Sequence, residues 1–221
     1  QALNGGLVSI GDSSAAATST SGAIRFIADG GTSNLSSRVE VPKLESYEGY
    51  QNGTAPGFYA QRGGHVSVAN LTTVSRSALE LKSGGTMDTT QLVSFSGGFF
   101  GDFTVLDQPA DFTNLESLSS AEVRITGLTQ PFPKLSNIDD SSWYLDGGAT
   151  VTLDAVQQYA YTSIDNSDRY FRADGVGSVL SLPNLSTISI INDFSNELFV
   201  QALNGGLVSI GDSSSAATST S

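Results

Sequence analysis

The chain has 221 residues, of which 38% are hydrophobic and 14% are charged, and it contains no cysteine. The lack of cysteine excludes disulfides, thiolate chemistry and cysteine-ligated zinc, and no apolar run reaches membrane-spanning length. The net charge of −12 argues against nucleic acid and anionic membranes as partners, because both require clustered Lys and Arg.

The beginning of the chain returns at its end. Residues 1–21 read QALNGGLVSIGDSSAAATSTS, and residues 201–221 repeat them with one change, from Ala15 to Ser215. A repeat of this length at a fixed offset predicts a tandem array. We therefore interpret residues 1–200 as one repeat unit and residues 201–221 as the start of the next.

A shorter phrase recurs inside the long repeat: a short apolar run, Gly-Gly, a second run, and then Asn-Leu-x-x-Ile or a variant of it. Eight phrases fill one repeat, with an average length of about 25 residues each. Their spacing varies, which predicts loops of different length on a common scaffold. In chain order the phrases occupy residues 1–10, 25–44, 58–74, 79–95, 103–118, 123–138, 143–153 and 170–190, and Leu198 begins the first phrase again.

The runs alternate apolar and polar residues, as in His65-Val66-Ser67-Val68 and Thr150-Val151-Thr152-Leu153. A period of two predicts half-buried strands, and Asp or Asn followed by Gly-Gly predicts a tight turn between them. No segment has a convincing amphipathic helical pattern; the best candidate, residues 154–161, is short.

A unit of about 25 residues cannot bury its apolar face alone, whereas stacked units bury it in one continuous core. The sequence therefore predicts an all-β fold, a parallel β-solenoid with about eight coils per repeat, in which each strand pairs with its counterpart one coil away. Inward-facing residues form ladders along the axis. The expected members are Val8, Val66, Val151 and Val179 in one ladder and Leu44, Leu71, Leu115, Leu135 and Leu185 in another.

The phrases Leu182-Pro-Asn-Leu-Ser-Thr-Ile188 and Asn70-Leu-Thr-Thr-Val74 resemble coils of bacterial right-handed parallel β-helix surface proteins, including giant Gly/Ser/Thr-rich proteins of planctomycete type. Their rhythm is also similar to that of receptor L-domains, although the cysteine framework of that family is missing. The resemblance implies a right-handed β-helix and a secreted or surface-exposed scaffold used in adhesion, fibres or recognition.

Residues that could carry chemistry are few. His65 is the only histidine, and its place in an alternating strand predicts a solvent-facing side chain. The acidic pairs could hold calcium, but they match no EF-hand or nonapeptide repeat, so we interpret them as turn residues. The most charged region could in principle serve a polysaccharide-active enzyme, but a solvated loop network is the simpler interpretation. The acidic pairs are Asp107 and Asp111, Asp139 and Asp140, and Asp165 and Asp168; the charged region adds Arg169, Arg172 and Asp174.

Two further groups allow a structural and a functional interpretation. Four Asn residues begin glycosylation sequons, of which only Asn52 lies outside the coil phrase or a variant of it and is plausible as an acceptor. The aromatic residues at the starts of coils are expected to stack in the core, with sugar binding as the alternative. The other sequons begin at Asn34, Asn70 and Asn184, and the aromatic residues are Phe58, Tyr59, Phe99, Phe100, Phe103, Trp143, Tyr144, Tyr170 and Phe171.

The sequence favours a non-enzymatic structural protein that forms an extracellular or cell-surface fibre, stalk or tether. We expect no catalytic, cofactor or metal site. The expected partners are neighbouring repeats joined end to end, with lateral self-association or a glycan also open. The alternatives are an adhesin or carbohydrate-binding surface on the same scaffold, and a polysaccharide-active β-helix enzyme.

Overall fold

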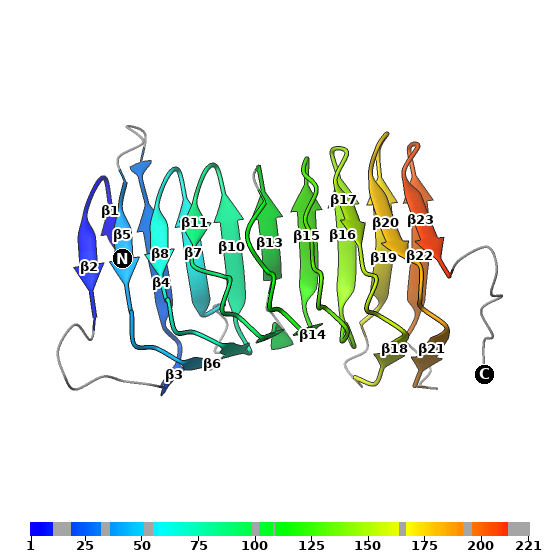
Figure 1. Ribbon diagram of the computed structural model, residues 1–221, viewed down its shortest axis with the longest axis horizontal. Coiled ribbons are helices and arrows are strands. Elements are labelled where there is room, and N and C mark those ends of the chain that lie inside the picture. The colour runs from blue at the N-terminus through cyan, green and yellow to red at the C-terminus, as the bar shows by residue number, and fades with distance from the viewer. Residues whose placement is uncertain are drawn as a thin grey trace.

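The computed structural model describes residues 1–10, 19–31, 36–50, 55–98, 102–107, 109–163, 167–191 and 196–211. Every named element in these ranges is a β-strand, and every strand pairing is parallel. The strands stack side by side along one axis, with β1 at one end and β22 at the other (Figure 1). The chain is a parallel β-solenoid, as the sequence predicts.

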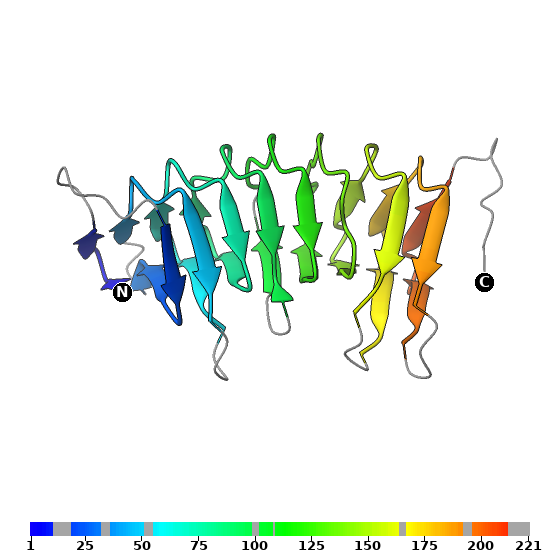
Figure 2. The same cartoon turned by 90° about the horizontal axis from the view of Figure 1, so that it is seen from below.

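One face of the solenoid is a continuous nine-stranded sheet that takes one strand from each coil. Figure 2 shows the strands of successive coils in rows along the long axis. In spatial order the strands of this sheet are β1 (Ala2–Leu3), β4 (Arg25–Asp29), β7 (Gly57–Gln61), β10 (Ala78–Lys82), β13 (Asp102–Leu106), β15 (Glu122–Thr126), β16 (Ser142–Asp146), β19 (Arg169–Asp174) and β22 (Leu198–Leu203).

The other two rows of strands are interrupted near the middle of the axis. The second row contains β2 (Leu7–Ser9), β5 (Arg38–Glu40), β8 (His65–Ser67) and β11 (Thr86–Met87), and then β17 (Thr150–Thr152), β20 (Val179–Leu182) and β23 (Leu207–Ile210). The third row contains β3 (Ser19–Gly22), β6 (Ser46–Gly49), β9 (Thr73–Ser75), β12 (Ser94–Ser96) and β14 (Ser117–Ser119), and then β18 (Gln158–Tyr161) and β21 (Thr187–Ile190).

The strand register confirms the predicted period. Ala2 pairs with Ala28, and following the same position from coil to coil leads, after eight coils, to Ala202, the equivalent of Ala2 in the repeated phrase. The separation of successive partners along the chain varies, so the coils differ in length while their strands stay aligned. The intervening partners are Ala60, Leu81, Val105, Ile125, Leu145 and Ala173.

The Gly-Gly turns have two separate physical causes, which the turn of residues 61–64 illustrates. Arg62 and Gly63 both have positive φ, 51° and 76°, and the Gly64 N–H donates to the Gln61 carbonyl at 2.9 Å. The first glycine thus supplies a left-handed conformation that costs other residues free energy. A Cβ on Gly64 would lie 2.2 Å from the Ala28 carbonyl oxygen, so the second glycine allows close packing on the preceding coil.

The Asn-Leu phrases form the next corner. In each phrase the leucine N–H closes a short turn, as in Leu71, which donates to the Val68 carbonyl at 2.8 Å. The asparagine side chain then ties the corner to the coil before: Asn70 donates to the Pro42 carbonyl at 2.6 Å, and Asn184 to the Asp154 carbonyl at 2.7 Å. The five leucines expected in one ladder are all buried.

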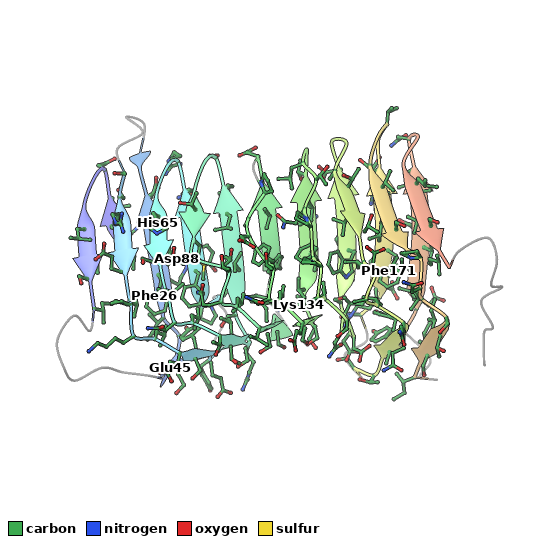
Figure 3. The ribbon with its side chains drawn as sticks, in the orientation of Figure 1. Phe26, Glu45, His65, Asp88, Lys134 and Phe171 are labelled. Carbon is green, nitrogen blue, oxygen red and sulfur yellow. The ribbon has the colours of Figure 1, made fainter. Side chains whose placement is uncertain are left out.

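The inward side chains fill a single core along the axis, and a cluster of aromatic rings lies within it. Phe103 contacts Phe95 and Phe112 with ring centroids 5.2 and 5.0 Å apart. Trp143 packs edge-on against Phe132, and its indole N–H donates to the Ser141 hydroxyl at 2.9 Å. Phe26 and Phe171 extend this core towards opposite ends of the solenoid (Figure 3).

One predicted ladder member is wrong. Val8 and Val66 pair in one column through Val39, and Val151 is buried in the corresponding column further along. Leu180, and not Val179, continues that column by pairing with Val151. The turn before it is Gly175-Val-Gly-Ser178, which holds one residue more than the turn before Val151, and one extra residue inverts the side to which a strand residue points.

Candidate functional site at the two end coils

The two copies of the repeated phrase form the first and last coils of the solenoid. Within the described part of the chain, β1 and β2 pair only with strands of the coil that follows them, whereas β22 and β23 pair only with strands of the coil before. Ala2, which pairs with Ala28 of the following coil, is 2% exposed, while Ala202, which pairs with Ala173 of the preceding coil, is exposed. The same sequence therefore packs against a following coil at one end of the solenoid and against a preceding coil at the other end.

The glycines of the end coils show which side each coil uses. A Cβ on Gly206 would lie 2.3 Å from the Ala173 carbonyl oxygen in the preceding coil. The equivalent Gly6 has nothing closer than the Leu3 carbonyl oxygen of its own turn, at 3.1 Å. The close packing that requires glycine at this position therefore occurs at the last coil and has no counterpart at the first.

The end coils are uncharged and apolar. Residues 1–11 and 201–211 contain no Asp, Glu, Lys or Arg, although the chain carries 22 acidic and 10 basic residues. Leu7 is 63% exposed, and Leu3 and Ile10 are also exposed at the same end. At the other end Val200, which occupies the core column of β22, is 50% exposed. Soluble proteins usually protect open sheet edges with charged residues, and these two edges lack them.

The lateral surface, in contrast, carries charged residues, and several of its basic residues pair with acidic residues on the same strand. Residues two apart on a strand point to the same side, which brings opposite charges together. Arg38 contacts Glu40 at 3.0 Å, Lys82 contacts Glu80 at 2.5 Å, and Arg124 pairs with Glu122. Such exposed pairs contribute about 0–1 kcal/mol each, so their main effect is on the surface and not on stability.

Asp29 precedes one of the Gly-Gly turns, and the sequence interpretation treats it as a turn residue; in the structure its carboxylate is buried and has further partners. The Arg62 guanidinium donates to it, Gln61 donates at 2.8 Å and the Gly31 N–H donates at 2.9 Å. The Arg62 hydrogen bond, more than any other contact, holds the pKa of Asp29 below its ordinary value, against the opposing effect of burial. Asp29 and Arg62 lie far apart in the chain but in adjacent coils, so their spacing in the sequence gives no signal.

His65 lies on the outer side of its strand, as predicted, and is half-buried. Its Nδ1 contacts the Thr86 hydroxyl at 2.9 Å, and its Nε2 lies 3.6 Å from an Asp88 carboxylate oxygen (Figure 3). Asp88 also accepts a hydrogen bond from Ser67 at 2.8 Å. These polar contacts link neighbouring coils along the second row of strands.

Four of the acidic candidates, Asp107, Asp111, Asp139 and Asp140, accept hydrogen bonds from backbone N–H groups or polar side chains, mostly of adjacent coils. Asp107 accepts from the Ser83 N–H at 2.6 Å, Asp139 from the Ala160 N–H at 2.7 Å, and Asp140 from the Thr162 N–H at 2.7 Å. The Thr113 hydroxyl, its N–H and Thr90 lower the pKa of Asp111. Among the residues that the structure describes, no group of three or more His, Asp or Glu could hold a metal ion. Asp165 lies outside the described residues.

The charged region around residues 168–174 does not form a convergent site. Arg172 pairs with Asp174 at 2.6 Å on the outer side of β19, and this pair lowers the pKa of Asp174. Arg169 instead donates to the Asp140 carbonyl at 2.8 Å and lies over the Tyr161 ring. The two arginines thus have different partners: Arg172 binds a carboxylate of its own strand, whereas Arg169 contacts residues of other segments.

The aromatic residues divide between the core and the outer side of the nine-stranded sheet. Phe58, Phe103, Trp143 and Phe171 are fully buried. On the outer side, the ring centroids of Tyr144 and Tyr170 are 5.7 Å apart, and Tyr170 stacks on Phe199 with ring centroids 5.2 Å apart. Arg124 lies 4.8 Å from the centre of the Tyr144 ring, while Tyr59 is near Arg25. Neighbouring side chains therefore cover faces of these rings. A bound sugar would need the same faces for stacking. Phe99 and Phe100 lie outside the described residues.

The sequon and pocket candidates are polar features of the scaffold. Asn70 and Asn184 use their side-chain amides in the corner hydrogen bonds described above, while Asn34 and Asn52 lie outside the described residues. A pocket of about 600 Å³ opens where the third row of strands is interrupted, and Asn137, Asp139 and Gln158 are among its lining residues. The Asp139 carboxylate in this lining accepts a hydrogen bond from the Ala160 N–H.

Comparison with known proteins gives no match to a protein-family model, a curated protein or a solved structure. Within the described part of the chain, no helix is long and apolar enough to cross a membrane.

Proposed function

We propose that the chain is one repeat, together with the start of the next, of a non-enzymatic structural protein that forms an extracellular or cell-surface fibre, stalk or tether. The observation that carries the proposal is the pair of matched end coils. The last coil needs glycine at position 206 to pack on the coil before it, and the first coil keeps glycine at the equivalent position 6. That residue has a packing role as soon as another coil precedes it.

The two end coils are also complementary in the side on which each one packs. The coil of residues 201–210 packs on a preceding coil, and the coil of residues 1–10, which has the same sequence, packs on a following one. If the rest of the repeat followed residue 221, the ladders of the nine-stranded sheet and of the second row would thus continue in register. The mechanism is mechanical, because axial hydrogen bonds and an unbroken core transmit load along the array.

Imaging of chains of different repeat number tests the proposal. Eight coils at about 4.8 Å predict an axial advance of about 38 Å per repeat. A chain with residues 1–200 twice, followed by residues 201–221, should form a rod of unchanged width that is about 38 Å longer than the 221-residue chain. Two separate bodies joined by a linker would contradict a continuous solenoid, and the fibre function with it.

A carbohydrate-binding surface is the second candidate, because Tyr144, Tyr170 and Phe199 form a half-exposed aromatic row beside Arg172 on a lateral face. Adhesion would use this row or the polar pocket. Glycan-array binding that disappears in Tyr170→Ala, while the length increment of the two-repeat chain is kept, would favour it. We give it second place because other side chains occupy ring faces in the row.

A further inference from the structure

Where the third row of strands begins, one backbone carbonyl joins each of several coils to the next. This carbonyl belongs to the residue after the corner leucine, or after Val156 in the coil that has valine there. The Thr72 carbonyl, for example, accepts the N–H groups of two consecutive residues of the following coil, Val93 at 2.8 Å and Ser94 at 3.1 Å. The carbonyls that accept two N–H groups in this way belong to Glu45, Thr72, Val93, Glu116 and Gln157.

Ser136 interrupts this series. Its carbonyl occupies the equivalent position, and the matching N–H groups of the next coil are those of Gln157 and Gln158, but no hydrogen bond joins these groups in the described part of the chain. The third row of strands stops after β14 and resumes at β18 (Figure 1). The pocket of about 600 Å³ opens at this place, and the three residues line it. Its walls therefore contain backbone groups whose equivalents pair with each other in neighbouring coils.

The opening is confined to the surface of the solenoid. The nine-stranded sheet stays paired between the same two coils, because β15 and β16 pair over five positions. Ile138 and Tyr159, which lie in the third row beside the gap, are fully buried, so the core remains closed. On one side of the gap, the Ala160 N–H donates to the Asp139 carboxylate at 2.7 Å in place of a backbone carbonyl. The Asp139 side chain thus acts as a spacer between the two coils.

Many hydrogen-bonding groups and little charge line the pocket. The side-chain amides of Gln157 and Gln158 make no hydrogen bond to another described residue, so each offers donors and an acceptor to a ligand. Asp139 is the one ionisable residue among the described lining residues, and Ala155 is the one apolar residue. The other members of the lining are Ser136, Asn137, Ser186 and Thr187.

We propose that this pocket binds a neutral sugar residue of a glycan. Its volume lies within the range of small-molecule sites, about 300–1,000 Å³, but such sites are usually lined by apolar side chains. A polar lining suits a ligand covered with hydroxyl groups, because each hydroxyl both donates and accepts. The single carboxylate, with no basic residue in the described lining and a chain charge of −12, disfavours phosphates, sulfates and acidic sugars.

The proposal concerns the polar pocket of the second candidate function, and not the aromatic row. In an array of repeats the pocket would recur once per 200 residues, about every 38 Å, so weak sites would act together on a surface that carries glycans. That consequence rests on the proposed fibre, whereas binding by a single chain does not. The length of the two-repeat chain still tests the fibre if the pocket binds no sugar.

Residue-resolved amide hydrogen exchange of the 221-residue chain, followed by nuclear magnetic resonance, tests the open position. The N–H groups of Gln157 and Gln158 should exchange much faster than those of Val93 and Ser94, which share the Thr72 carbonyl in a closed coil. Slow exchange of both glutamine amides in the free chain would show that the coils are closed here, and it would overturn the proposal.

The same amide signals test binding. Cellotriose, chitotriose and mannotriose serve as neutral probes at millimolar concentration, with tri-galacturonic acid as the acidic counterpart and a serine-rich peptide as the alternative occupant. At least one neutral probe should shift the Gln157 and Gln158 signals and slow their exchange. No shift with any neutral probe, or a shift with the acid or the peptide alone, would overturn the proposal. Shifts around Tyr170 alone would also overturn it and would favour the aromatic row.

A double substitution identifies the groups that hold the sugar. Gln157→Ala with Gln158→Ala removes two side-chain amides that bind no other described residue, so the melting temperature should not change. Affinity for the bound trisaccharide should fall about tenfold, as expected for the loss of one or two neutral hydrogen bonds. Ser94→Ala, at the position equivalent to Gln158 in a closed coil, is the matched control and should leave the affinity unchanged. Equal affinity of the double variant and the control would place the sugar elsewhere and overturn the proposal.

Discussion

Two valines in the same inner column of the nine-stranded sheet allow a matched test of the open end. Val123 is fully buried, with Phe103 and Trp143 as its neighbours in the column, whereas Val200 is 50% exposed. Replacing valine by alanine removes about two CH₂ equivalents, or about 1.6 kcal/mol of transfer free energy for a fully buried side chain. With the cavity that remains, we expect Val123→Ala to lower the free energy of unfolding by about 2–3 kcal/mol.

Val200→Ala should cost about 0.8 kcal/mol, because only half of the side chain leaves water on folding and no closed cavity forms. In a chain with two full repeats, the next coil covers Val200 with the equivalent of Phe26. The same substitution, made at the internal copy only, should then cost as much as Val123→Ala. The destabilisation caused by Val200→Ala should thus be about 1–2 kcal/mol larger in the two-repeat chain than in the 221-residue chain.

Urea unfolding, followed by the fluorescence of the single tryptophan Trp143 and by circular dichroism, measures both costs. The circular dichroism signal is needed because repeat arrays can lose a terminal coil before the rest unfolds. Equal costs for the two substitutions in the 221-residue chain would refute the uncovered end. An internal Val200→Ala substitution whose cost stays at about 0.8 kcal/mol in the two-repeat chain would refute the continuous junction.

Four other substitutions test single positions. Since its bound partners lower the pKa of Asp29, this carboxylate stabilises the fold above about pH 4 and the contribution is lost as the pH falls through the lowered pKa. Asp29→Asn should therefore flatten the fall of the urea midpoint in acid, and unchanged pH dependence would contradict this. Gly64→Ala should destabilise strongly, because its Cβ would meet the backbone of the preceding coil, whereas Gly6→Ala should have little effect on the melting temperature of the 221-residue chain. Asn184→Ala should cost about 1 kcal/mol through loss of its bond to the Asp154 carbonyl, and thermal unfolding that shows no shift would argue against this corner contact.

The fold could be predicted because the signals that define it are local and repeated. Alternation within each run identifies strands, and the second period, of about 25 residues, shows that the strands must stack. The leucines of the Asn-Leu corners were placed correctly for the same reason. Val179 was misplaced because the direction of a strand residue depends on the number of residues in the turn before it, and that turn has one residue more than its counterpart before Val151.

Contacts between coils could not be predicted from spacing, because the separation of successive partners along the chain changes from one coil to the next. The pair of Asp29 and Arg62 therefore appears only once the register is known. The end site had a visible sequence signal, namely a nearly uncharged repeated phrase in an acidic chain. Its meaning depends on structure, since only the different surroundings of Gly6 and Gly206 show which side of the phrase packs on a neighbouring coil at each end.

The separation of charge between the sides and the ends predicts how salt affects association. The net charge of −12 lies outside the two end coils, so side-by-side contact brings like charges together while end-to-end contact does not. Raising the ionic strength from about 0.1 to 1 M shortens the Debye length from about 10 to 3 Å and weakens the lateral repulsion. Filaments should therefore thicken with salt while their axial repeat stays the same, which electron microscopy can measure at each salt concentration. End-to-end joining that is itself strongly salt-dependent would show that charges, and not the apolar end coils, control the junction.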